Sequence, residues 1–418
     1  MNIKNEEIHY IDNDPENGFV VDYDKVNYYF DQLKVPADVW TPRHIDLYKA
    51  DWVVAISKRS RGKTTNVILY NLIIYLMYGS IVPYVRSDDT ELKMSFIQHM
   101  FEVILQFKYI DKLTNGQYNS VYYHAKHFYL CHLDEDGNRD VTDNKPFMIC
   151  VSLTMSEDVK STLNLPLSVH ALYDEFMRHT YRTDEFIELC QLLSTIRRDR
   201  LHFKVFMLSN MNSPYNQYLK ELDIMKFVQK MEPGTWDSYT ANRGARLHVE
   251  YIADDYASHV KDKKLSAAII RRAKTTAAMF GFSNPKLKSI VGGGWDFNNY
   301  PHLPKRQKDE QRTVVNRDIY LVYYDRIICM ELTRSSRIGT YVNCREYTGA
   351  LRRGTIKFVL TEPSDPLEFY GWGTTKNRVC RLVWNLYSAC RFFYSDNEVG
   401  RIVEEFVENY RTNRKLLR

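Results

Sequence analysis

The chain has 418 residues, 44% hydrophobic and 14% aromatic, which is enough to bury the cores of two or three domains without disulfides. Its net charge of +5, from 57 basic and 52 acidic residues, is too small to indicate nucleic-acid binding by the chain as a whole. Seven scattered cysteines without a Cys-x-x-Cys pair favour free thiols in a reducing cytoplasm. Because the N-terminus lacks an apolar signal region and no apolar run reaches about 18 residues, we expect neither export nor a membrane span.

The first 45 residues are acidic at the start and then become rich in aromatic side chains. These side chains are Tyr23, Tyr28, Tyr29, Phe30 and Trp40. Two interpretations stay open for the segment. Its rings pack against a sheet, which is the commoner arrangement, or they lie over the adenine of a bound nucleotide.

An apolar strand predicted at residues 52–57 runs directly into a loop of small and basic residues, and a long apolar helix follows. The loop and the start of the helix read Ser57, Lys58, Arg59, Ser60, Arg61, Gly62, Lys63, Thr64 and Thr65. This order presents backbone N–H groups to an anion, while Lys63 can reach the β- and γ-phosphates of ATP and the Thr64 hydroxyl can bind Mg²⁺. The sequence therefore predicts a nucleotide phosphate site.

This loop departs from the usual phosphate-binding pattern at its first position, where Ser57 stands in place of glycine or alanine. Its charge nevertheless favours a bound anion, because four cations in one short loop repel one another unless an anion lies among them. The four cations are Lys58, Arg59, Arg61 and Lys63. The alternative interpretation is a basic surface turn before a core helix.

Helices and strands alternate after the loop, as in a parallel sheet that is covered by helices. The expected elements are a helix over 67–77 that Gly79 ends, a strand over 81–85, a helix over 90–107, two strands within 120–133 and a strand over 147–153.

A mostly apolar strand over 168–173 ends in two adjacent carboxylates, Asp174 and Glu175. If this strand ends beside the loop around Gly62, Asp174 can hold the water shell of the Mg²⁺, and Glu175 can orient or deprotonate the attacking water. A solvated strand end is the ordinary alternative. The position of the pair within an alternating α/β pattern favours the catalytic interpretation.

A predicted helix over 186–196 leads to the basic run Arg197-Arg198-Asp199-Arg200, and a strand over 203–208 follows. Arginines at a helix end are ordinarily favourable C-terminal charges. In a ring of ATPases, however, such an edge can present an arginine to the γ-phosphate of a neighbour. Ser209 and Asn210, at the tip of the strand, could sense the γ-phosphate by hydrogen bonding, or they could form a simple turn before Pro214.

The α/β pattern breaks up after Pro214. A short helix expected near residues 265–280 carries a cluster of cations, which either are solvated or meet phosphates of DNA or structured RNA. They are Lys261, Lys263, Lys264, Arg271, Arg272 and Lys274. A hairpin over 318–332, a strand over 355–360 and two helices close the chain. The last helix carries an apolar stripe from Val399 to Tyr410, which we interpret as core.

Together these features resemble the DNA-packaging ATPases of tailed bacteriophages, the terminase large-subunit group, and most closely the compact motors of small, protein-primed phages. The features are Arg59 to Thr65, Tyr173 to Phe176, the block from Arg197 to Asn210, and Tyr387 to Val399. The phosphate loop of that family often lacks its first glycine and carries an arginine at the place that Arg59 occupies. The resemblance therefore explains Ser57.

The resemblance implies a mainly α/β chain in three parts: a P-loop ATPase domain of the ASCE/RecA-like type with a parallel sheet (1–215), a small helical linker domain (216–290) with a hinge at Gly292-Gly293-Gly294, and a C-terminal α+β RNase H-like domain (291–418). It also assigns Asp174 and Glu175 to the metal and the water, Ser209 and Asn210 to coupling, and a trans-acting arginine finger to Arg198, with Arg200 as the second candidate.

A nuclease of the RNase H type needs three or four carboxylates that converge on two metal ions. The available aspartates are Asp318, Asp325, Asp365 and Asp396, but none follows the Gly-Ile/Leu-Asp pattern of the first metal ligand. We therefore expect a vestigial nuclease that is retained for binding nucleic acid or the portal.

The sequence thus favours an ATP- and Mg²⁺-dependent double-stranded DNA translocase that packages a phage genome. By resemblance it acts as a homopentameric ring at the portal of the procapsid in the host cytoplasm, without a membrane, and a packaging RNA is a further partner that the resemblance allows. Two alternatives remain: a terminase with an active metal-dependent nuclease, and a P-loop protein that uses ATP only as a switch. Glu175 argues against the switch, which needs no water-activating carboxylate.

Overall fold

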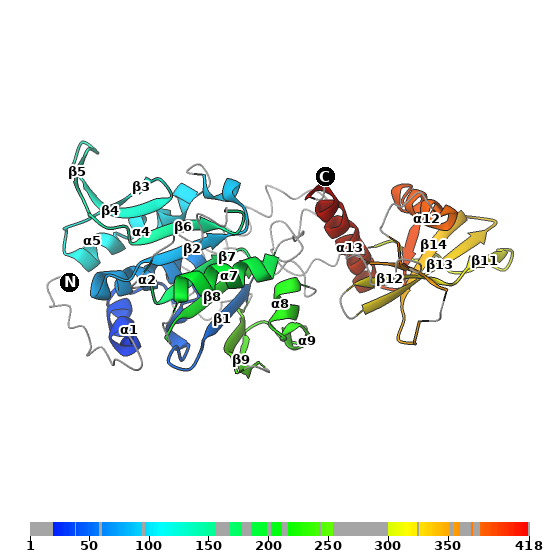
Figure 1. The fold of residues 1–418 in the computed structure, drawn as a ribbon, viewed down its shortest axis with the longest axis horizontal. Coiled ribbons are helices and arrows are strands. Elements are labelled where there is room, and N and C mark those ends of the chain that lie inside the picture. The colour runs from blue at the N-terminus through cyan, green and yellow to red at the C-terminus, as the bar shows by residue number, and fades with distance from the viewer. Residues whose placement is uncertain are drawn as a thin grey trace. The chain divides into compact units, whose positions relative to one another are not determined.

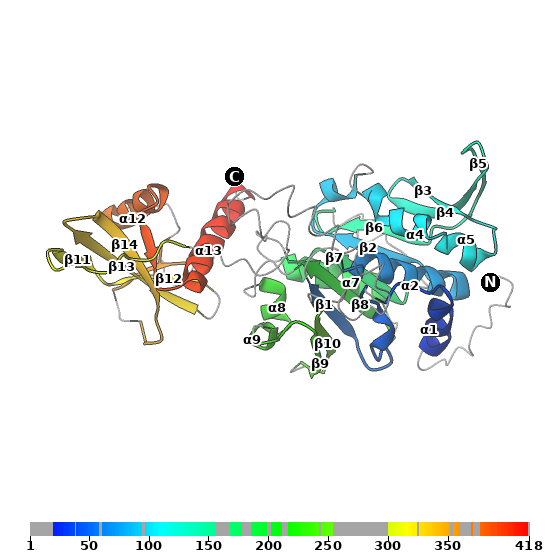
Figure 2. The same ribbon diagram turned by 180° about the vertical axis from the view of Figure 1, so that it is seen from behind.

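The computed structural model describes residues 20–37, 39–57, 61–93, 97–155, 165, 168–177, 185–198, 202–210, 216–228, 230–241, 244–253, 300–323, 326–351, 354–359, 369–370 and 377–416. The described residues fall into two compact units, one up to residue 253 and one from residue 300 (Figures 1 and 2).

The first unit is built on a large sheet with the strand order β3-β4-β6-β2-β7-β8-β1-β10-β9, to which β5 adds by pairing with β4. The strands are β1 (Trp52–Ser57), β2 (Val82–Arg86), β3 (Ser120–His124), β4 (His127–Leu133), β5 (Arg139–Thr142), β6 (Met148–Ser152), β7 (His170–Asp174), β8 (Lys204–Asn210), β9 (Thr235–Thr240) and β10 (Arg246–Tyr251). The central strands, which lie in the order β6-β2-β7-β8-β1-β10, are all parallel. The predicted parallel sheet is therefore confirmed.

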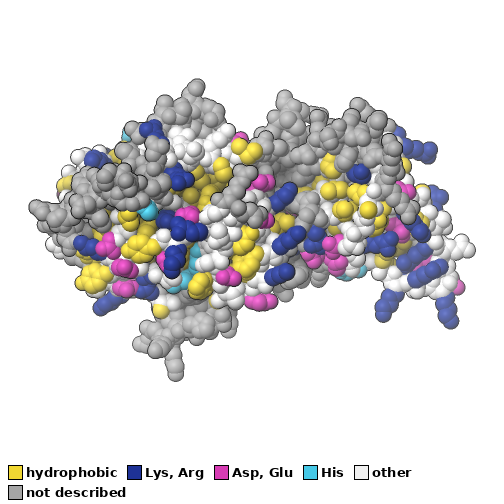
Figure 3. All heavy atoms as spheres, turned by 60° about the horizontal axis from the view of Figure 1, so that its bottom comes forward, with side chains coloured by type: hydrophobic (Ala, Val, Ile, Leu, Met, Phe, Trp, Pro, Cys, Tyr) yellow, Lys and Arg dark blue, Asp and Glu magenta, His cyan; other side chains and the backbone are white. Residues whose placement is uncertain are grey.

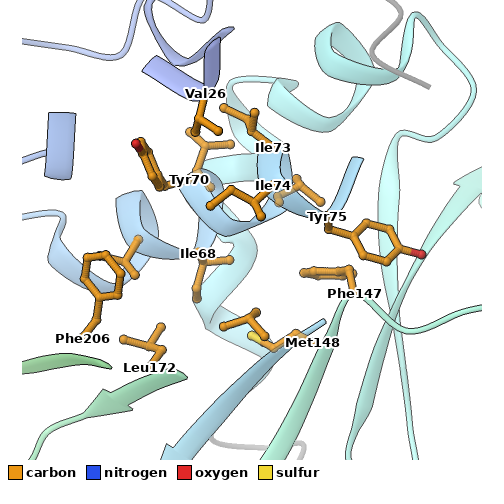
Figure 4. Close-up of a cluster of buried hydrophobic side chains, with 14 of the residues drawn as sticks. Val26, Ile68, Tyr70, Ile73, Ile74, Tyr75, Phe147, Met148, Leu172 and Phe206 are labelled. Atoms are coloured by element: carbon orange, nitrogen blue, oxygen red, sulfur yellow. The ribbon is translucent and has the colours of Figure 1, made fainter. Parts of the chain in front are cut away.

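Helix α2 (Lys63–Tyr78) lies at the centre of the core of this unit. Its sequence is apolar on most faces because the helix is buried almost all round, between the sheet and α1 (Tyr23–Gln32). Figure 4 shows Ile68 above Leu172 and Phe206 of the sheet, with Val26 of α1 on the other side of the helix. Tyr23, Tyr29, Phe30 and Trp40 are also buried, as the packing interpretation of the aromatic segment requires, whereas Tyr28 is exposed.

Helix α7 (Glu185–Arg197) covers the opposite face of the sheet from α2. Leu172 packs in the core cluster of α2, while the next residue, Tyr173, donates a hydrogen bond from its hydroxyl to Glu185 of α7. Since successive side chains of a strand point to opposite faces, the two helices sandwich β7. Further helical segments of the unit are η2 (Pro42–His44), α5 (Tyr109–Thr114), α8 (Gln217–Glu221) and α9 (Met225–Val228).

Two expectations for this unit are wrong. The helix expected over 90–107 is broken into η3 (Asp89–Leu92), η4 (Gln98–Phe101) and α4 (Glu102–Gln106), because Lys93 takes an extended conformation that ends the first turn. The sheet also continues after Pro214 in the residues described up to 253, since β10 pairs in parallel with β1 and β9 pairs with β10. Part of the range expected for the linker domain thus lies in the large sheet.

The second unit is a sheet with the order β16-β15-β12-β13-β14-β17, with β11 paired to β13 and two helices against it. Its elements are β11 (Arg312–Asn316), β12 (Ile319–Tyr323), β13 (Arg326–Ser335), β14 (Gly339–Glu346), β15 (Ile356–Phe358), β16 (Phe369–Tyr370), β17 (Phe392–Tyr394), α12 (Arg378–Ser388) and α13 (Asn397–Leu416). The hairpin expected over 318–332 is confirmed as β12 and β13. The stripe of α13 is core, since Val399, Ile402, Val403, Phe406 and Val407 are buried.

Candidate nucleotide site

The carboxyl ends of β1, β7 and β8 meet at one edge of the large sheet. In the register of the sheet, Ser57 of β1 lies opposite Asn210 of β8, and Asp174 of β7 lies opposite Leu208 of β8. In open parallel sheets this edge is where ligands bind. Polar residues at the ends of strands that are far apart in the sequence therefore lie close together.

The turn between β1 and α2 depends on Gly62. Its φ of +77° lies in the left-handed region, and a Cβ added there would come within 2.9 Å of Asn66 Nδ2 and 3.0 Å of Val39 Cβ. The segment before β1 holds this turn: Trp40 N donates to the carbonyl of Arg61 at 2.9 Å, and Asn66 Nδ2 donates to the carbonyl of Trp40 at 2.6 Å. The first backbone N–H groups of α2, including that of Thr65, lie directly after the turn.

Lys63 places a buried cation between the three strand ends. The residue is only 7% exposed, and Nζ donates to Ser57 Oγ and, at 3.4 Å, to Asn210 Oδ1. Burial lowers the pKa of Lys63 to about 8, while the charges of Glu175 and Asp174 act in the opposite direction. Among the described residues, no carboxylate forms an ion pair with the ammonium group that would offset its desolvation.

Asp174 and Thr64 are joined directly. Thr64 Oγ1 donates to Asp174 Oδ1 at 3.0 Å, and Asp174 is buried. The other carboxylate oxygen, Oδ2, accepts a hydrogen bond from the Tyr84 hydroxyl at 2.9 Å and lies 3.6 Å from Arg86. A hydroxyl and an anchored carboxylate side by side are oxygen ligands of the kind that Mg²⁺ prefers.

Glu175 continues β7 in an unusual conformation. Its φ is +58°, in the left-handed region that residues other than glycine seldom adopt, and its N–H donates to the carbonyl of Leu208 at 2.7 Å. Asn210 Nδ2 donates to Glu175 Oε1 at 2.9 Å, so one amide bridges Glu175 and Lys63.

Ser209 makes different contacts from its neighbour Asn210. The hydroxyl of Ser209 is buried, accepts a hydrogen bond from Met177 N at 3.0 Å and donates to the carbonyl of Asn210 at 3.1 Å. Its bonding capacity is therefore used to hold the segment after Glu175 against the tip of β8.

Tyr84 and Arg86 were missed at the sequence level. Both lie on β2, which pairs with β7, and Arg86 Nη1 also donates to the backbone carbonyl of Asp174 at 3.3 Å. The signal was available, because Arg86 ends the apolar strand that follows α2 just as Asp174 ends β7. What the sequence does not reveal is that β2 and β7 are neighbours.

A buried carboxylate behind the site, Glu185, was also missed. Its Oε1 accepts hydrogen bonds from Ser87 Oγ at 2.6 Å, from the Tyr218 hydroxyl at 2.8 Å and from the Tyr173 hydroxyl at 3.2 Å. These contacts tie the end of β2, the strand β7 and α8 to the start of α7. Glu185 thus supports the two strands that carry Arg86 and Asp174.

Arg198 lies at the end of α7 and is not part of this cluster. It is exposed, with a φ of +48°, and its N–H closes the helix on the carbonyl of Ser194 at 2.9 Å. Four further predicted residues, Lys58, Arg59, Ser60 and Arg200, lie outside the described residues.

Of the aspartates considered for a nuclease, Asp325 and Asp365 lie outside the described residues, as does the basic cluster from Lys261 to Lys274. Asp318 is exposed. Asp396 caps the start of α13, where its Oδ1 accepts from Val399 N at 2.9 Å. On the face that Figure 3 presents, Lys and Arg side chains are interspersed with Asp and Glu side chains. Within the described ranges, no helix is long and apolar enough to cross a membrane.

No protein-family model and no curated protein matches the chain. Among solved structures, it is similar to a chain of the bacteriophage Phi-29 viral genome packaging motor assembly, with 16% identity over 89% of this chain and 99% of the other and a TM-score of 0.51. The Phi-28 DNA packaging motor (16% identity, 90% and 98% covered, TM-score 0.46) and the large terminase of the thermophilic bacteriophage D6E (11%, 89% and 96%, 0.35) are also similar. By the Phi-29 comparison, this chain has the fold of a bacteriophage DNA-packaging motor, the group that its sequence resembles.

Proposed function

We propose that the chain is an ATPase that drives double-stranded DNA into a phage procapsid. The observation that carries the proposal is the meeting of Lys63, Thr64, Asp174 and Glu175 at one edge of the sheet. The fold shared with the Phi-29 motor supports the cargo, which the site by itself does not specify.

The residues of this edge fit ATP with Mg²⁺. The buried ammonium of Lys63, which forms no ion pair with a described carboxylate, would receive the β- and γ-phosphates, and Thr64 and Asp174 would hold the metal ion. Mg²⁺ supplies neutralisation of the charge that develops on the transferred phosphoryl group. Tyr84 and Arg86 keep the carboxylate of Asp174 turned toward Thr64.

Glu175 is the proposed general base. Its backbone is left-handed, and the amide of Asn210 holds its carboxylate by a hydrogen bond. Since the same amide contacts Lys63, a phosphate that draws Lys63 away would free Asn210 to follow the γ-phosphate. This exchange of partners is the coupling role that we propose for Asn210.

A cavity of about 550 Å³ next to the turn at Gly62 is the proposed position of the base and ribose. It is lined by Asn27, Asp31, Pro36, Ala37, Val39, Thr41, Arg43 and His44. Val39 connects the cavity to the turn, because its Cβ lies beside Gly62. The buried rings of Tyr23, Phe30 and Trp40 do not line the cavity, so the base would lie against aliphatic and polar groups and the imidazole ring of His44.

The exposed Arg198 supports a site that two subunits complete. An arginine finger stabilises the charge of the transition state and contributes about 10³ to 10⁵ in rate. We propose that Arg198, or Arg200, reaches the γ-phosphate of a neighbour in a ring, with five subunits by resemblance. The portal, the procapsid in the host cytoplasm and a packaging RNA are proposed partners on the same basis.

For the second unit we propose binding of nucleic acid or portal without cleavage. The helix-capping contact of Asp396 supports this, because a carboxylate that accepts a backbone hydrogen bond in a cap serves the fold. An active nuclease is the alternative. Incubation of plasmid DNA with Mg²⁺ or Mn²⁺ decides between the two, since cleavage that Asp325→Ala or Asp396→Ala abolishes would establish a nuclease.

The proposed function is tested by measuring ATP hydrolysis and the movement of double-stranded DNA by the purified chain with procapsids. Glu175→Gln should bind ATP with Mg²⁺ but lose hydrolysis and DNA uptake together, while the control Glu221→Gln, an exposed carboxylate of α8, should retain both. Normal turnover in Glu175→Gln would instead favour an ATP-binding switch. A wild-type chain that binds no ATP would overturn the proposal.

A further inference from the structure

The side chains of two histidines and a glutamate lie close together beside Trp40, in the segment that precedes β1. His248 and Glu250 lie on the same face of β10, two residues apart, and His44 belongs to η2. One potential ligand atom from each of the three side chains lies within 4.8 Å of the other two. His44 Nε2 is 2.9 Å and His248 Nε2 is 3.5 Å from the same oxygen, Glu250 Oε2.

The hydrogen bonds of this cluster leave one buried nitrogen without a partner. Glu250 Oε2 also accepts a hydrogen bond from Trp40 Nε1 at 2.8 Å, so three donors compete for one oxygen. His248 is 3% exposed, and within the described residues its Nε2 makes no hydrogen bond. A buried imidazole nitrogen that points at a carboxylate without bonding to it is costly unless another group lies between them.

A metal ion would satisfy all three side chains at once. Neutral imidazoles and a carboxylate are ordinary ligands of Zn²⁺, at about 2.0–2.2 Å, which places neighbouring ligand atoms about 3.3–3.5 Å apart. The distances to Glu250 Oε2 of 2.9 and 3.5 Å are close to that separation. The Trp40 indole N–H already supplies the hydrogen bond that commonly orients a ligating carboxylate.

We propose that His44, His248 and Glu250 bind a zinc-type divalent transition metal, distinct from the Mg²⁺ expected at Thr64 and Asp174. Three protein ligands leave one position for water. The metal would fasten the segment of Trp40 and His44 to β10. Because Trp40 also holds the turn at Arg61 through its backbone, the metal would stabilise the nucleotide loop from outside.

Cobalt is the probe of choice, because Co²⁺ adopts zinc sites and has a visible absorption spectrum, whereas Zn²⁺ is d¹⁰. The full chain, stripped with a chelator and free of nucleotide, should bind one Co²⁺ per chain. Zn²⁺ should displace it, and excess Mg²⁺ should not. Since no nucleotide is present, the result does not depend on ATP hydrolysis.

Three variants test the ligands. His44→Gln and His248→Asn should each abolish the cobalt band, and bound zinc measured by elemental analysis should fall from one ion per chain to background. His132→Gln removes another histidine that pairs with a carboxylate, Asp140, and should leave the band unchanged. If His248→Asn does not fold, His44→Gln decides, because that side chain is 36% exposed. Absence of the band in the wild type, or a band that survives in His44→Gln, overturns the proposal.

Discussion

Thr64 Oγ1 lies 3.0 Å from Asp174 Oδ1, although 110 residues separate the two in the chain. The contact joins the first turn of α2 to the end of β7, across the strand β8 that lies between β1 and β7. In the proposed function, these two side chains would hold the Mg²⁺ ion.

Thr64→Ala should therefore lose Mg²⁺-dependent ATP hydrolysis by at least about tenfold, because it removes one oxygen ligand of the metal. Thr64→Ser keeps the hydroxyl and should retain most of the activity. Thr195→Ala, which removes a hydroxyl from α7, is the control. The rate of phosphate release as a function of Mg²⁺ concentration measures the effect, and equal rates in Thr64→Ala and Thr64→Ser would contradict the metal-binding role.

Lys63 makes the stability of the nucleotide-free chain depend on pH. Its pKa in the folded chain is about 8, against an ordinary value of 10.5, because burial disfavours the charged form. The unfolded chain therefore holds this proton more tightly. The penalty is fully present below pH 8, and the free energy of unfolding should rise between pH 8 and about 10.5, by on the order of 3 kcal/mol at most.

Replacement of Lys63 by Met should remove this rise and stabilise the nucleotide-free chain near pH 7. Urea denaturation of both proteins at several pH values between 7 and 10.5 measures the difference. Bound phosphate favours the charged ammonium, so ATP binding to the wild type should be accompanied by proton uptake near pH 8, which calorimetry in buffers of different ionisation enthalpy detects. Parallel stability curves for the two proteins would refute the expectation.

Gly62→Ala should destabilise the chain more than Gly137→Ala. Both glycines have a φ near +80°, so each alanine pays for a left-handed backbone, about 1–2 kcal/mol. A Cβ at Gly137 meets nothing within 4 Å, whereas one at Gly62 meets Asn66 and Val39. The difference in denaturation midpoint between the variants therefore isolates the cost of the contacts. Only Gly62→Ala should also weaken ATP binding.

The trans-acting role of Arg198 is best tested by mixing inactive variants. Glu175→Gln and Arg198→Ala should each hydrolyse ATP poorly, and a mixture of the two should regain part of the activity. Recovery follows because some interfaces then combine an intact Glu175 from one subunit with an intact Arg198 from the next. Arg197→Ala, at the neighbouring exposed position, serves as the control for Arg198→Ala. A mixture no more active than its components would exclude completion of the site between subunits.

The residues of the candidate site could be named from the sequence because they stand in short, recognisable segments. The loop from Ser57 to Thr65 combines a strand, a glycine, a lysine and a threonine in a row, and Asp174 and Glu175 end an apolar strand. Periodicity also predicted the buried stripe of α13. Periodicity failed in two places. Between residues 90 and 107, local backbone turns override an apolar pattern. At β9 and β10, polar and apolar residues alternate, but the stretch before these strands carries no clear α/β pattern.

The sequence by itself determined which residue types could bind a nucleotide, because those motifs are local and their spacing along the chain is enough to recognise them. Only the tertiary structure decided which strands are neighbours, and therefore that Tyr84 and Arg86 support Asp174, that Asn210 bridges Lys63 and Glu175, and that His44 meets His248 and Glu250. The reason is physical. The order of strands in a parallel sheet depends on the way in which the long crossover connections pack against it, and no short stretch of sequence encodes that packing.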